Sequence, residues 1–214
     1  MHDRCGANSS TLAALRRRAA AARPSPYHRR VTRTAAFLVF ATPIGDCAIA
    51  WSADGLSGVW LPSSVAGALP RTIVRRHSDA LAAPPPAEFA TLPGAIARLL
   101  AGERIDFGGV RLDLADVDPF DARVYVAART VPVGEFVTYG ELAARVGADA
   151  TAREVGQSLG RNRWPIVVPC HRIVASGNGL GGFSAPGGTA TKQRLLAIER
   201  ARRSVAPDLF DAVR

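Results

Sequence analysis

The stretch TYGELAARVGADATAREVGQSLGRN, residues 138–162, contains the same helix-start signal twice. Thr138 is followed three positions later by Glu141, and Thr151 is followed in the same way by Glu154. In such a capping box, the threonine hydroxyl and the glutamate carboxylate each accept a hydrogen bond from a backbone N–H that the first turn leaves unpaired. Two short helices joined by a short polar turn predict a helix-turn-helix, although an ordinary antiparallel helix pair has the same pattern.

The segments around this helix pair extend a mostly helical unit over residues 116–203. Asp118 before Pro119 is a helix-start signal, and Pro132 ends the helix that begins there. A last helix is predicted over residues 189–203, since its leucines and isoleucine recur on one side.

The preceding part of the chain, residues 34–115, has a different pattern, which predicts a small α/β unit. Short apolar runs are broken at residues 43–45 and at the Asp-Gly turn in residues 53–55, as in a β-meander. A proline-rich connector leads into a predicted helix over residues 88–103. Residues 105–114 are predicted to form one more strand or an extended segment.

The composition favours a soluble globular protein with an anionic partner. Of the 214 residues, 48% are hydrophobic, which is enough for a packed core, and no apolar run is long enough to span a bilayer. The net charge of +9 is carried almost wholly by arginine, with Lys192 as the single lysine. Such a charge favours nucleic acid as a partner, although a GC-rich genome would also enrich arginine and alanine.

The two ends of the chain are read as tails. Residues 1–33 are rich in arginine, poor in acidic residues and interrupted by prolines. A transit peptide, a disordered basic arm and a start codon assigned too early all fit this composition. We expect the disordered arm, because no hydrophobic signal core follows, and we expect residues 204–214 to be a C-terminal tail.

Three cysteines, Cys5, Cys47 and Cys170, are far apart and show no CxxC spacing. This argues against a disulfide framework and fits a reducing compartment. His28 and His77 do not have the spacing of a zinc finger, so no metal is expected. Cys47 lies in a strand-like run and is expected to be a buried core residue.

The stretch PIVVPCHRIV, residues 165–174, leaves two interpretations of Cys170 open: a buried core residue or a nucleophile. A free thiol has a pKa of ~8.5, so a nucleophile needs a partner that favours the thiolate. His171 is the candidate base, directly or through one water. A carboxylate must orient that histidine, and Glu199 on the last helix is the best candidate, although a solvated glutamate is the common alternative.

Together, these segments resemble the methylated-DNA–protein-cysteine methyltransferases, the O6-alkylguanine-DNA alkyltransferases. The resemblance covers residues 118–200 and rests on PCHRIV, VTYGELAARVG, TAREVGQSLGRN and GLGGFSAPGGTATKQRLLAIE, in that family's arrangement. The turns TPIG and DGL also resemble the family's first domain. The resemblance implies an α/β N-terminal domain of ribonuclease-H-like fold and a mostly α C-terminal helix-turn-helix domain of winged-helix-like fold.

The same resemblance implies a single-turnover reaction. Cys170 would accept a methyl or alkyl group from O6 of guanine, and from O4-alkylthymine as well, with His171 taking the thiol proton through a water. Glu199 would hold His171. Tyr139 would donate a hydrogen bond to N3 of the leaving guanine, and Lys192 would support the site electrostatically.

Because the reactive atom lies inside duplex DNA, the resemblance also implies that the nucleotide is flipped out. Arg153 would fill the gap, and Asn162 would link the second helix to the active-site segment. Without the resemblance, Tyr139 would be interpreted as a core aromatic, Arg153 as a solvated arginine and Asn162 as a helix cap. Substrate and DNA contacts are implied for Tyr139, Thr151, Ala152, Arg153, Gly156, Val168, Phe183 and Ser184.

Two alternative functions remain open at this point. A lesion sensor of related fold would bind without transfer, but in that group the acceptor cysteine is replaced, commonly by tryptophan. An unrelated Cys-His hydrolase would need an oxyanion hole rather than a capped helix pair. The expected partner is double-stranded DNA with alkylated guanine, and we expect a monomer without cofactor, membrane or obligate protein partner in the bacterial cytoplasm. Phe183 and the long SAPGG segment depart from some relatives, and the pair Arg163-Trp164 departs from many. Trp164 is expected to pack beneath the DNA-binding face.

Overall fold

A computed structural model describes residues 36–63, 65, 67–177 and 179–203. These residues belong to one compact unit, Val31–Arg214. Both predicted tails, residues 1–33 and 204–214, lie outside the described residues.

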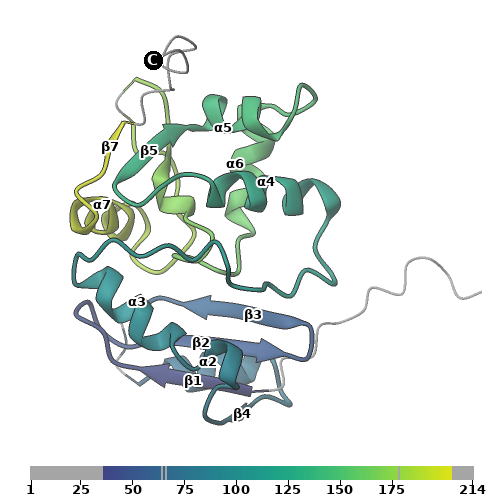
Figure 1. Cartoon of the computed structure of the whole chain (residues 1–214), viewed down its shortest axis with the longest axis vertical. Coiled ribbons are helices and arrows are strands. Elements are labelled where there is room, and N and C mark those ends of the chain that lie inside the picture. The colour runs from purple at the N-terminus through teal and green to yellow at the C-terminus, as the bar shows by residue number, and fades with distance from the viewer. Residues whose placement is uncertain (1–35, 64, 66, 178, 204–214) are drawn as a thin grey trace, which may run out of the picture. The chain divides into compact units, whose positions relative to one another are not determined.

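The predicted β-meander is confirmed (Figure 1). Strands β1 (Ala36–Phe40), β2 (Cys47–Ser52) and β3 (Gly55–Trp60) pair antiparallel, and the short β4 (Leu81–Ala82) adds to β1 in parallel. The resulting order is β3-β2-β1-β4. The Asp-Gly turn needs its glycine, because Gly55 has φ of +141° and a Cβ there would lie 2.9 Å from the carbonyl oxygen of Arg111.

Strand β2 alternates between two hydrophobic clusters, as the two-residue period of a strand requires. Its odd-numbered residues join the larger cluster together with helix α3 (Leu92–Leu100). Its even-numbered alanines pack with helix α2 (Leu69–Arg76). The sheet therefore separates α2 from α3. Helix α2 was not predicted, because it has eight residues and its buried positions, Leu69 and Ile73, give one repeat of the helical period.

Two predictions for the end of this region need adjustment. The helix expected over residues 88–103 is divided into a 3₁₀ turn, Ala87–Phe89, and α3. Residues 105–114, predicted as a strand or an extended segment, turn at Gly108 and Gly109 and make a single bridge within the described part of the chain, between Leu56 and Leu112. Arg129 fixes this segment by donating hydrogen bonds to three of its carbonyl oxygens, those of Phe107, Gly108 and Val110.

The predicted helices of the second half are confirmed, including both capping boxes and the Asp118 cap. A small parallel sheet in the order β6-β5-β7 accompanies them and was not predicted. Its strands contain two to four residues each, too few for a periodic pattern. The elements in chain order are α4 (Pro119–Arg129), β5 (Glu135–Thr138), α5 (Tyr139–Val146), α6 (Ala152–Gly160), the 3₁₀ helix η2 (Cys170–Arg172), β6 (Ile173–Val174), α7 (Gly188–Ile198) and β7 (Arg202–Arg203).

The last helix is shorter than predicted. Helix α7 ends at Ile198, and Glu199 is its C-cap residue rather than a residue inside the helix. Arg200 follows with φ of +52°, a left-handed conformation that ends the helix. The chain then pairs with β5, where Glu135 faces Arg202. The carboxylate of Glu199 is thereby left inside the protein instead of on a solvated helix face.

Trp164 joins β3 to the second half of the chain. Its side chain is fully buried, and its Nε1 donates a hydrogen bond of 2.6 Å to the carbonyl oxygen of Leu56. Its ring meets that of Tyr125 edge to face at 5.7 Å, and the Tyr125 hydroxyl donates to the carbonyl oxygen of Ser158 in α6. The indole is thus connected to α6 through Tyr125.

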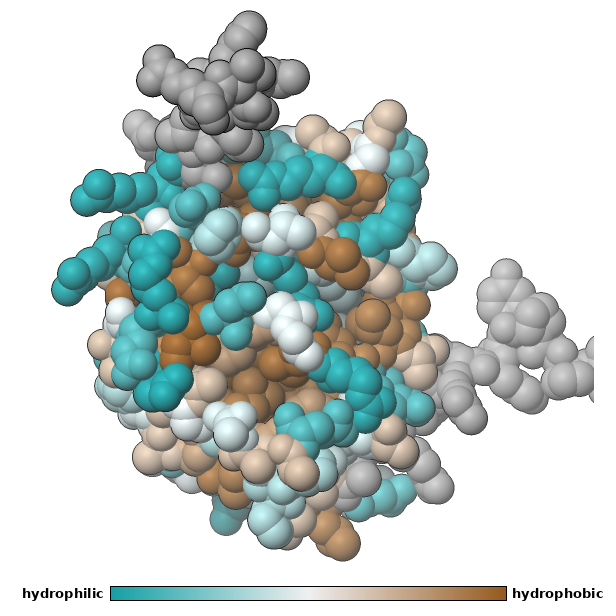
Figure 2. Space-filling model, viewed as in Figure 1, coloured by the Kyte–Doolittle hydropathy of each residue, from teal (hydrophilic) through white to brown (hydrophobic). Residues whose placement is uncertain are grey.

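On the face shown in Figure 2, apolar residues appear as separate patches among hydrophilic ones. None of the helices in the described part of the chain combines the length and apolar character needed to cross a bilayer.

Candidate active site

Cys170 begins the 3₁₀ helix η2, between a buried segment and the edge strand β6. Ile166 has φ of +76°, so the chain turns sharply just before the cysteine. The backbone N–H of Cys170 donates to the carbonyl oxygen of Val168 at 2.8 Å. Only 6% of Cys170 is exposed. The two prolines of the motif and this turn therefore present the cysteine at a cavity wall rather than on an open surface.

Asn162, just after α6, is hydrogen-bonded to the active-site segment at three points. Its Nδ2 donates to Sγ of Cys170 at 3.2 Å and to the carbonyl oxygen of Val168 at 2.9 Å. Its Oδ1 accepts from the backbone N–H of Trp164 at 2.9 Å. A shift of α6 would therefore change the hydrogen bond that Asn162 donates to Sγ of Cys170.

The thiol of Cys170 does not have the lowered pKa that the sequence argument required. Burial raises the pKa of Cys170, and this effect outweighs the hydrogen bond from Asn162 and the positive charge of Lys192, which both lower it. The thiol is therefore protonated at neutral pH in this structure. A base must remove its proton during a reaction.

His171 can act as such a base. Its Nε2 lies 2.9 Å from Oε1 of Glu199, and both side chains are buried. Because burial lowers the pKa of His171, the imidazole is neutral near pH 7. Glu199 is ionised and has no proton to give, so Nε2 carries the hydrogen and Nδ1 keeps its lone pair. Within the described part of the chain, Nδ1 is buried and has no hydrogen-bond partner.

Arg172 is a site residue that sequence reasoning missed. Its Nε and Nη2 donate to the two carboxylate oxygens of Glu199, each at 2.9 Å, and its Nη1 donates to the carbonyl oxygen of Val131. Burial alone would raise the pKa of Glu199, but hydrogen bonds and charges from His171 and Arg172 lower it to about 2. Arg172 is part of the PCHRIV motif, and this position was the available signal.

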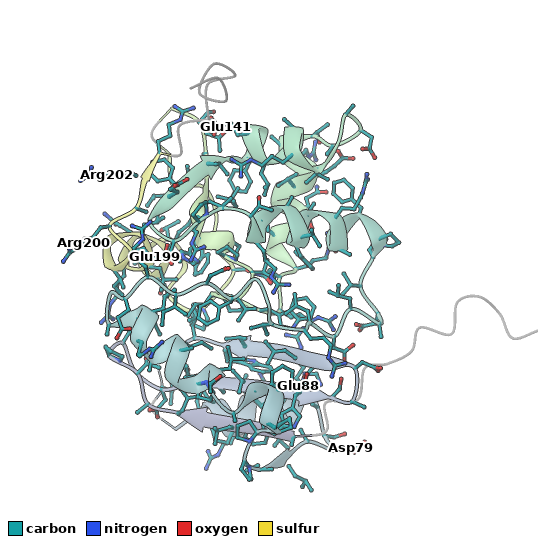
Figure 3. The ribbon with its side chains drawn as sticks, in the orientation of Figure 1. Asp79, Glu88, Glu141, Glu199, Arg200 and Arg202 are labelled. Carbon is teal, nitrogen blue, oxygen red and sulfur yellow. The ribbon has the colours of Figure 1, made fainter. Side chains whose placement is uncertain are left out.

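Figure 3 shows the different directions of these neighbouring side chains. Glu199 is directed into the protein beside α7, whereas Arg200 and Arg202 point away from it.

Tyr139 and the buried Lys192 beside its ring lie close to Cys170. Lys192 is fully buried, and its Nζ donates to the carbonyl oxygens of Ile173 and Gly182 and lies 5.5 Å from the centre of the Tyr139 ring. Burial lowers the pKa of Lys192 to about 8, so the ammonium is retained at neutral pH. The Tyr139 hydroxyl donates to the carbonyl oxygen of Gly182 at 3.4 Å, and burial raises its pKa, so it remains a hydrogen-bond donor.

A cavity of about 480 Å³ lies between α6 and the glycine-rich loop. It has Cys170 in its wall, and it unites seven of the residues predicted from the sequence. Gly156 keeps the space beside the Tyr139 ring open, because a Cβ at this position would fill it and contact the ring at 3.7 Å. The cavity is lined by Tyr139, Ala152, Arg153, Gly156, Leu159, Gly160, Cys170, Gly182, Phe183 and Ser184.

Two predicted contact residues lie outside the lining of this cavity. Thr151 is the N-cap of α6, so its hydroxyl serves the helix start. Val168 is buried, and its carbonyl oxygen accepts hydrogen bonds from Asn162 and from the N–H of Cys170. Thr151 therefore fixes the start of α6, and Val168 fixes the positions of Asn162 and Cys170.

The described residues contain no group of three or more histidine, cysteine or acidic side chains placed to hold a metal ion. Cys47 and Cys170 are both free thiols. Burial raises the pKa of Cys47 to about 11, and the residue is fully buried, as predicted for a core cysteine.

Comparisons with known proteins agree with this arrangement. Residues 119–201 match the model of the 6-O-methylguanine DNA methyltransferase DNA-binding domain. A protein of Mycolicibacterium paratuberculosis named methylated-DNA–protein-cysteine methyltransferase is 40% identical over 126 residues, which cover 59% of this chain and 74% of that protein. A Methanothermobacter thermautotrophicus protein of the same name is 31% identical over 157 residues, covering 73% of this chain and 81% of the relative.

Among solved structures, Mycobacterium tuberculosis OGT in complex with DNA has a similar fold, with a TM-score of 0.61 and 30% identity. The match covers 77% of this chain and 92% of that one, so it includes both the α/β part and the helical part. With the shared sequence, the shared fold and the cysteine at the cavity wall, this chain belongs to the methylated-DNA–protein-cysteine methyltransferase family.

Proposed function

We propose that this protein repairs DNA by transferring a methyl or alkyl group from O6 of guanine to Cys170, once per molecule. The observation that carries the proposal is the cavity between α6 and the glycine-rich loop. It has a cysteine in its wall, and a buried histidine–glutamate pair adjoins that cysteine in sequence. Members of this family are named for that transfer.

The proton of the thiol goes to His171. Nδ1 of His171 is the unprotonated ring nitrogen, and a water bound to it would relay the proton from Sγ. Glu199 holds the ring and stabilises the imidazolium that forms, and Arg172 holds Glu199 in turn. Sγ then attacks the alkyl carbon, the C–O6 bond breaks, and guanine leaves with the electron pair. The S-alkyl thioether is stable, so the protein is consumed.

The leaving guanine is stabilised by Tyr139 in the cavity wall and by the buried Lys192 beside it. The Tyr139 hydroxyl donates a hydrogen bond to N3 as negative charge spreads over the ring, after which the base is protonated. Lys192 lies close enough to Tyr139 and Cys170 to favour both the anionic base and the thiolate.

Reaction on duplex DNA requires the nucleotide to leave the stack, at a cost of a few kcal/mol. Helix α6 enters the minor groove, with exposed Arg153 at its second position filling the space left by the base. Ala152 and Gly156 on the same helix are small enough for close approach. Phe183 and Ser184 cover the base from the loop. Contacts of this kind carry little sequence information, which suits repair at any site.

Several further assignments belong to the same proposal. The protein also accepts O4-alkylthymine, acts as a monomer without a cofactor, and works in the cytoplasm, where a reducing environment preserves the thiol. Residues 34–115 form a ribonuclease-H-like domain, and residues 116–203 form a winged-helix-like domain that binds DNA.

The direct test uses duplex DNA with one O6-methylguanine. The expected result is a gain of one methylene on the Cys170 peptide, measured by mass spectrometry, with a yield that never exceeds one per protein. Cys170→Ala should abolish the mass gain and keep DNA binding. Cys47→Ala should retain the mass gain. Binding without a mass gain would indicate a lesion sensor, and repeated turnover of an ester would indicate a hydrolase. Either result would refute the proposal.

A further inference from the structure

Cys170 borders a second cavity, whose lining includes Phe183 and Ser184 and no residue of α6. Its volume is about 270 Å³, and it contacts Asn162 and Pro165 on one side and residues of β3 and α2 on the other. Cys170, Phe183 and Ser184 line both cavities, so the two meet at the nucleophile. The first cavity holds Tyr139 and Arg153, the residues proposed to serve the base, and neither lines the second.

This arrangement gives the second cavity a place in the transfer reaction. Asn162, which donates to Sγ, lines the second cavity and not the first. With guanine on the α6 side of the sulfur, atoms beyond the transferred carbon have the second cavity available. A transferred methyl group would leave the second cavity nearly empty, because the volume of this cavity is several times the ~30 Å³ of one water molecule.

The second cavity is cationic. Its lining includes Arg76, His77 and Arg163 and contains no carboxylate. The charge of Arg163 is already matched, because its guanidinium binds the carboxylate of Asp116, with one contact at 2.6 Å, and stacks 4.8 Å from the Trp164 ring.

Arg76 differs from Arg163 in this respect. It is an exposed residue in the last turn of α2, and within the described part of the chain it has no ion pair. His77 beside it packs edge to face against Trp60, with the ring centres 6.2 Å apart. Burial and the charges of Arg76 and Arg163 lower the pKa of His77, so it is neutral at pH 7 and Arg76 is the uncompensated cation of the lining.

We propose that the second cavity is a subsite for the alkyl substituent, that it favours substituents ending in a carboxylate, and that Arg76 determines this preference. The inference rests on the proposed alkyl transfer. In the reaction, Sγ bonds to the carbon attached to O6, that C–O6 bond breaks, and guanine takes the electron pair, while the terminal carboxylate is unchanged. A nearby cation is needed because the substituent's negative charge would otherwise oppose the thiolate.

The test compares two substrates of nearly equal shape in duplex DNA: guanine with a 3-carboxypropyl group on O6, and the same group as its primary amide. Transfer rates to Cys170 are measured for the wild-type protein and for Arg76→Gln. Arg75→Gln is the matched control, because Arg75 is also exposed on α2 and does not line the cavity. O6-methylguanine serves as a reference substrate in each case.

The wild-type protein is expected to transfer the carboxylate substrate about two- to fivefold faster than the amide, the range typical of an exposed charge pair. Arg76→Gln is expected to abolish this preference, and Arg76→Glu to reverse it, while Arg75→Gln retains the wild-type ratio. Methyl transfer should be equal in all four proteins. The preference should also decline as ionic strength rises, because an exposed charge pair is screened.

The outcomes separate this inference from the proposed function. Normal methyl transfer with equal wild-type rates for carboxylate and amide would overturn the inference alone, as would a preference that Arg76→Gln leaves intact. Failure of the wild-type protein to accept any methyl group would overturn the proposed function itself.

Discussion

Asn162 and Cys170 are joined by a hydrogen bond of 3.2 Å from the side-chain amide to Sγ. The same amide nitrogen also binds the carbonyl oxygen of Val168, two residues before the cysteine. A buried thiol usually resists ionisation, and this bond is one of the interactions that oppose the effect of burial. Asn162, just after α6, therefore lowers the pKa of the Cys170 thiol.

Replacing Asn162 by alanine should slow transfer about tenfold or more, because a hydrogen bond to a charged acceptor contributes roughly 1.5–3 kcal/mol. The pKa of the Cys170 thiol should rise further above its ordinary value, so the alkaline limb of the pH–rate profile should move to higher pH. Single-turnover transfer rates between pH 6 and 10 measure this shift. Gln157→Ala, an exposed change on α6, is the control. An unchanged limb in Asn162→Ala would show that the amide does not affect ionisation.

Glu199 should make the stability of the protein depend on acid pH. Its pKa of about 2 lies below the ordinary value of 4.5, so its contribution is fully present above pH 4.5 and is lost as pH falls toward 2. Urea unfolding at a series of pH values should show the free-energy difference between wild-type and Glu199→Gln shrinking through that window. Glu199→Gln should also slow methyl transfer, because His171 loses its anionic partner.

The control for Glu199 is Glu103→Gln, which alters an exposed carboxylate that contacts Arg98. It should leave the pH dependence of unfolding unchanged. A constant difference between wild-type and Glu199→Gln from pH 5 to pH 2.5 would contradict the assigned pKa.

Arg153 should matter for duplex DNA and little for a free base. Arg153→Ala removes the side chain proposed to occupy the gap in the stack, so transfer from duplex O6-methylguanine should fall at least tenfold. Transfer from free O6-methylguanine, which needs no extrusion, should stay within about twofold. Both rates are measured by labelling of Cys170, with Arg194→Ala as a control for loss of an exposed arginine. Equal losses on the two substrates would remove the gap-filling role.

Gly181 allows the glycine-rich loop to approach Tyr139. It has φ of +68°, and a Cβ there would lie 2.7 Å from Cε2 of Tyr139. Gly181→Ala should therefore displace the ring or the loop and reduce both methyl transfer and thermal stability, with about 1 kcal/mol lost from the backbone conformation alone.

Gly94→Ala on α3 is the opposite case, because a Cβ there meets nothing within 4 Å and φ is not positive. Alanine should stabilise that helix by about 0.5–1 kcal/mol and leave transfer unchanged. Thermal melts of both variants provide the comparison, and a Gly181→Ala protein as stable and active as the wild type would refute the steric argument.

The sequence was sufficient where structure is fixed by neighbours along the chain. Capping boxes at Thr138 and Thr151 fixed the starts of α5 and α6, because each box uses hydrogen bonds within four residues. The Asp-Gly turn set the β2–β3 hairpin for the same reason. Cys170 and His171 could be identified as a pair because they are adjacent.

Other features depended on contacts between distant segments, and local pattern could not reveal them. The small parallel sheet and the short helix α2 are stabilised by tertiary packing. The end of α7 at Ile198 depends on β5, far earlier in the chain. The pairing of Arg172 with Glu199 joins residues 27 positions apart and needed the complete fold to become visible.

By itself, the sequence of this protein predicted a nucleophile, Cys170, a base for it, His171, and the helices that stand beside them. The tertiary structure decided how those groups ionise: it raised the pKa of Cys170, kept His171 neutral and kept Glu199 charged. The physical reason is that ionisation depends on burial and on nearby charges in three dimensions, neither of which is a property of the residues next in the chain.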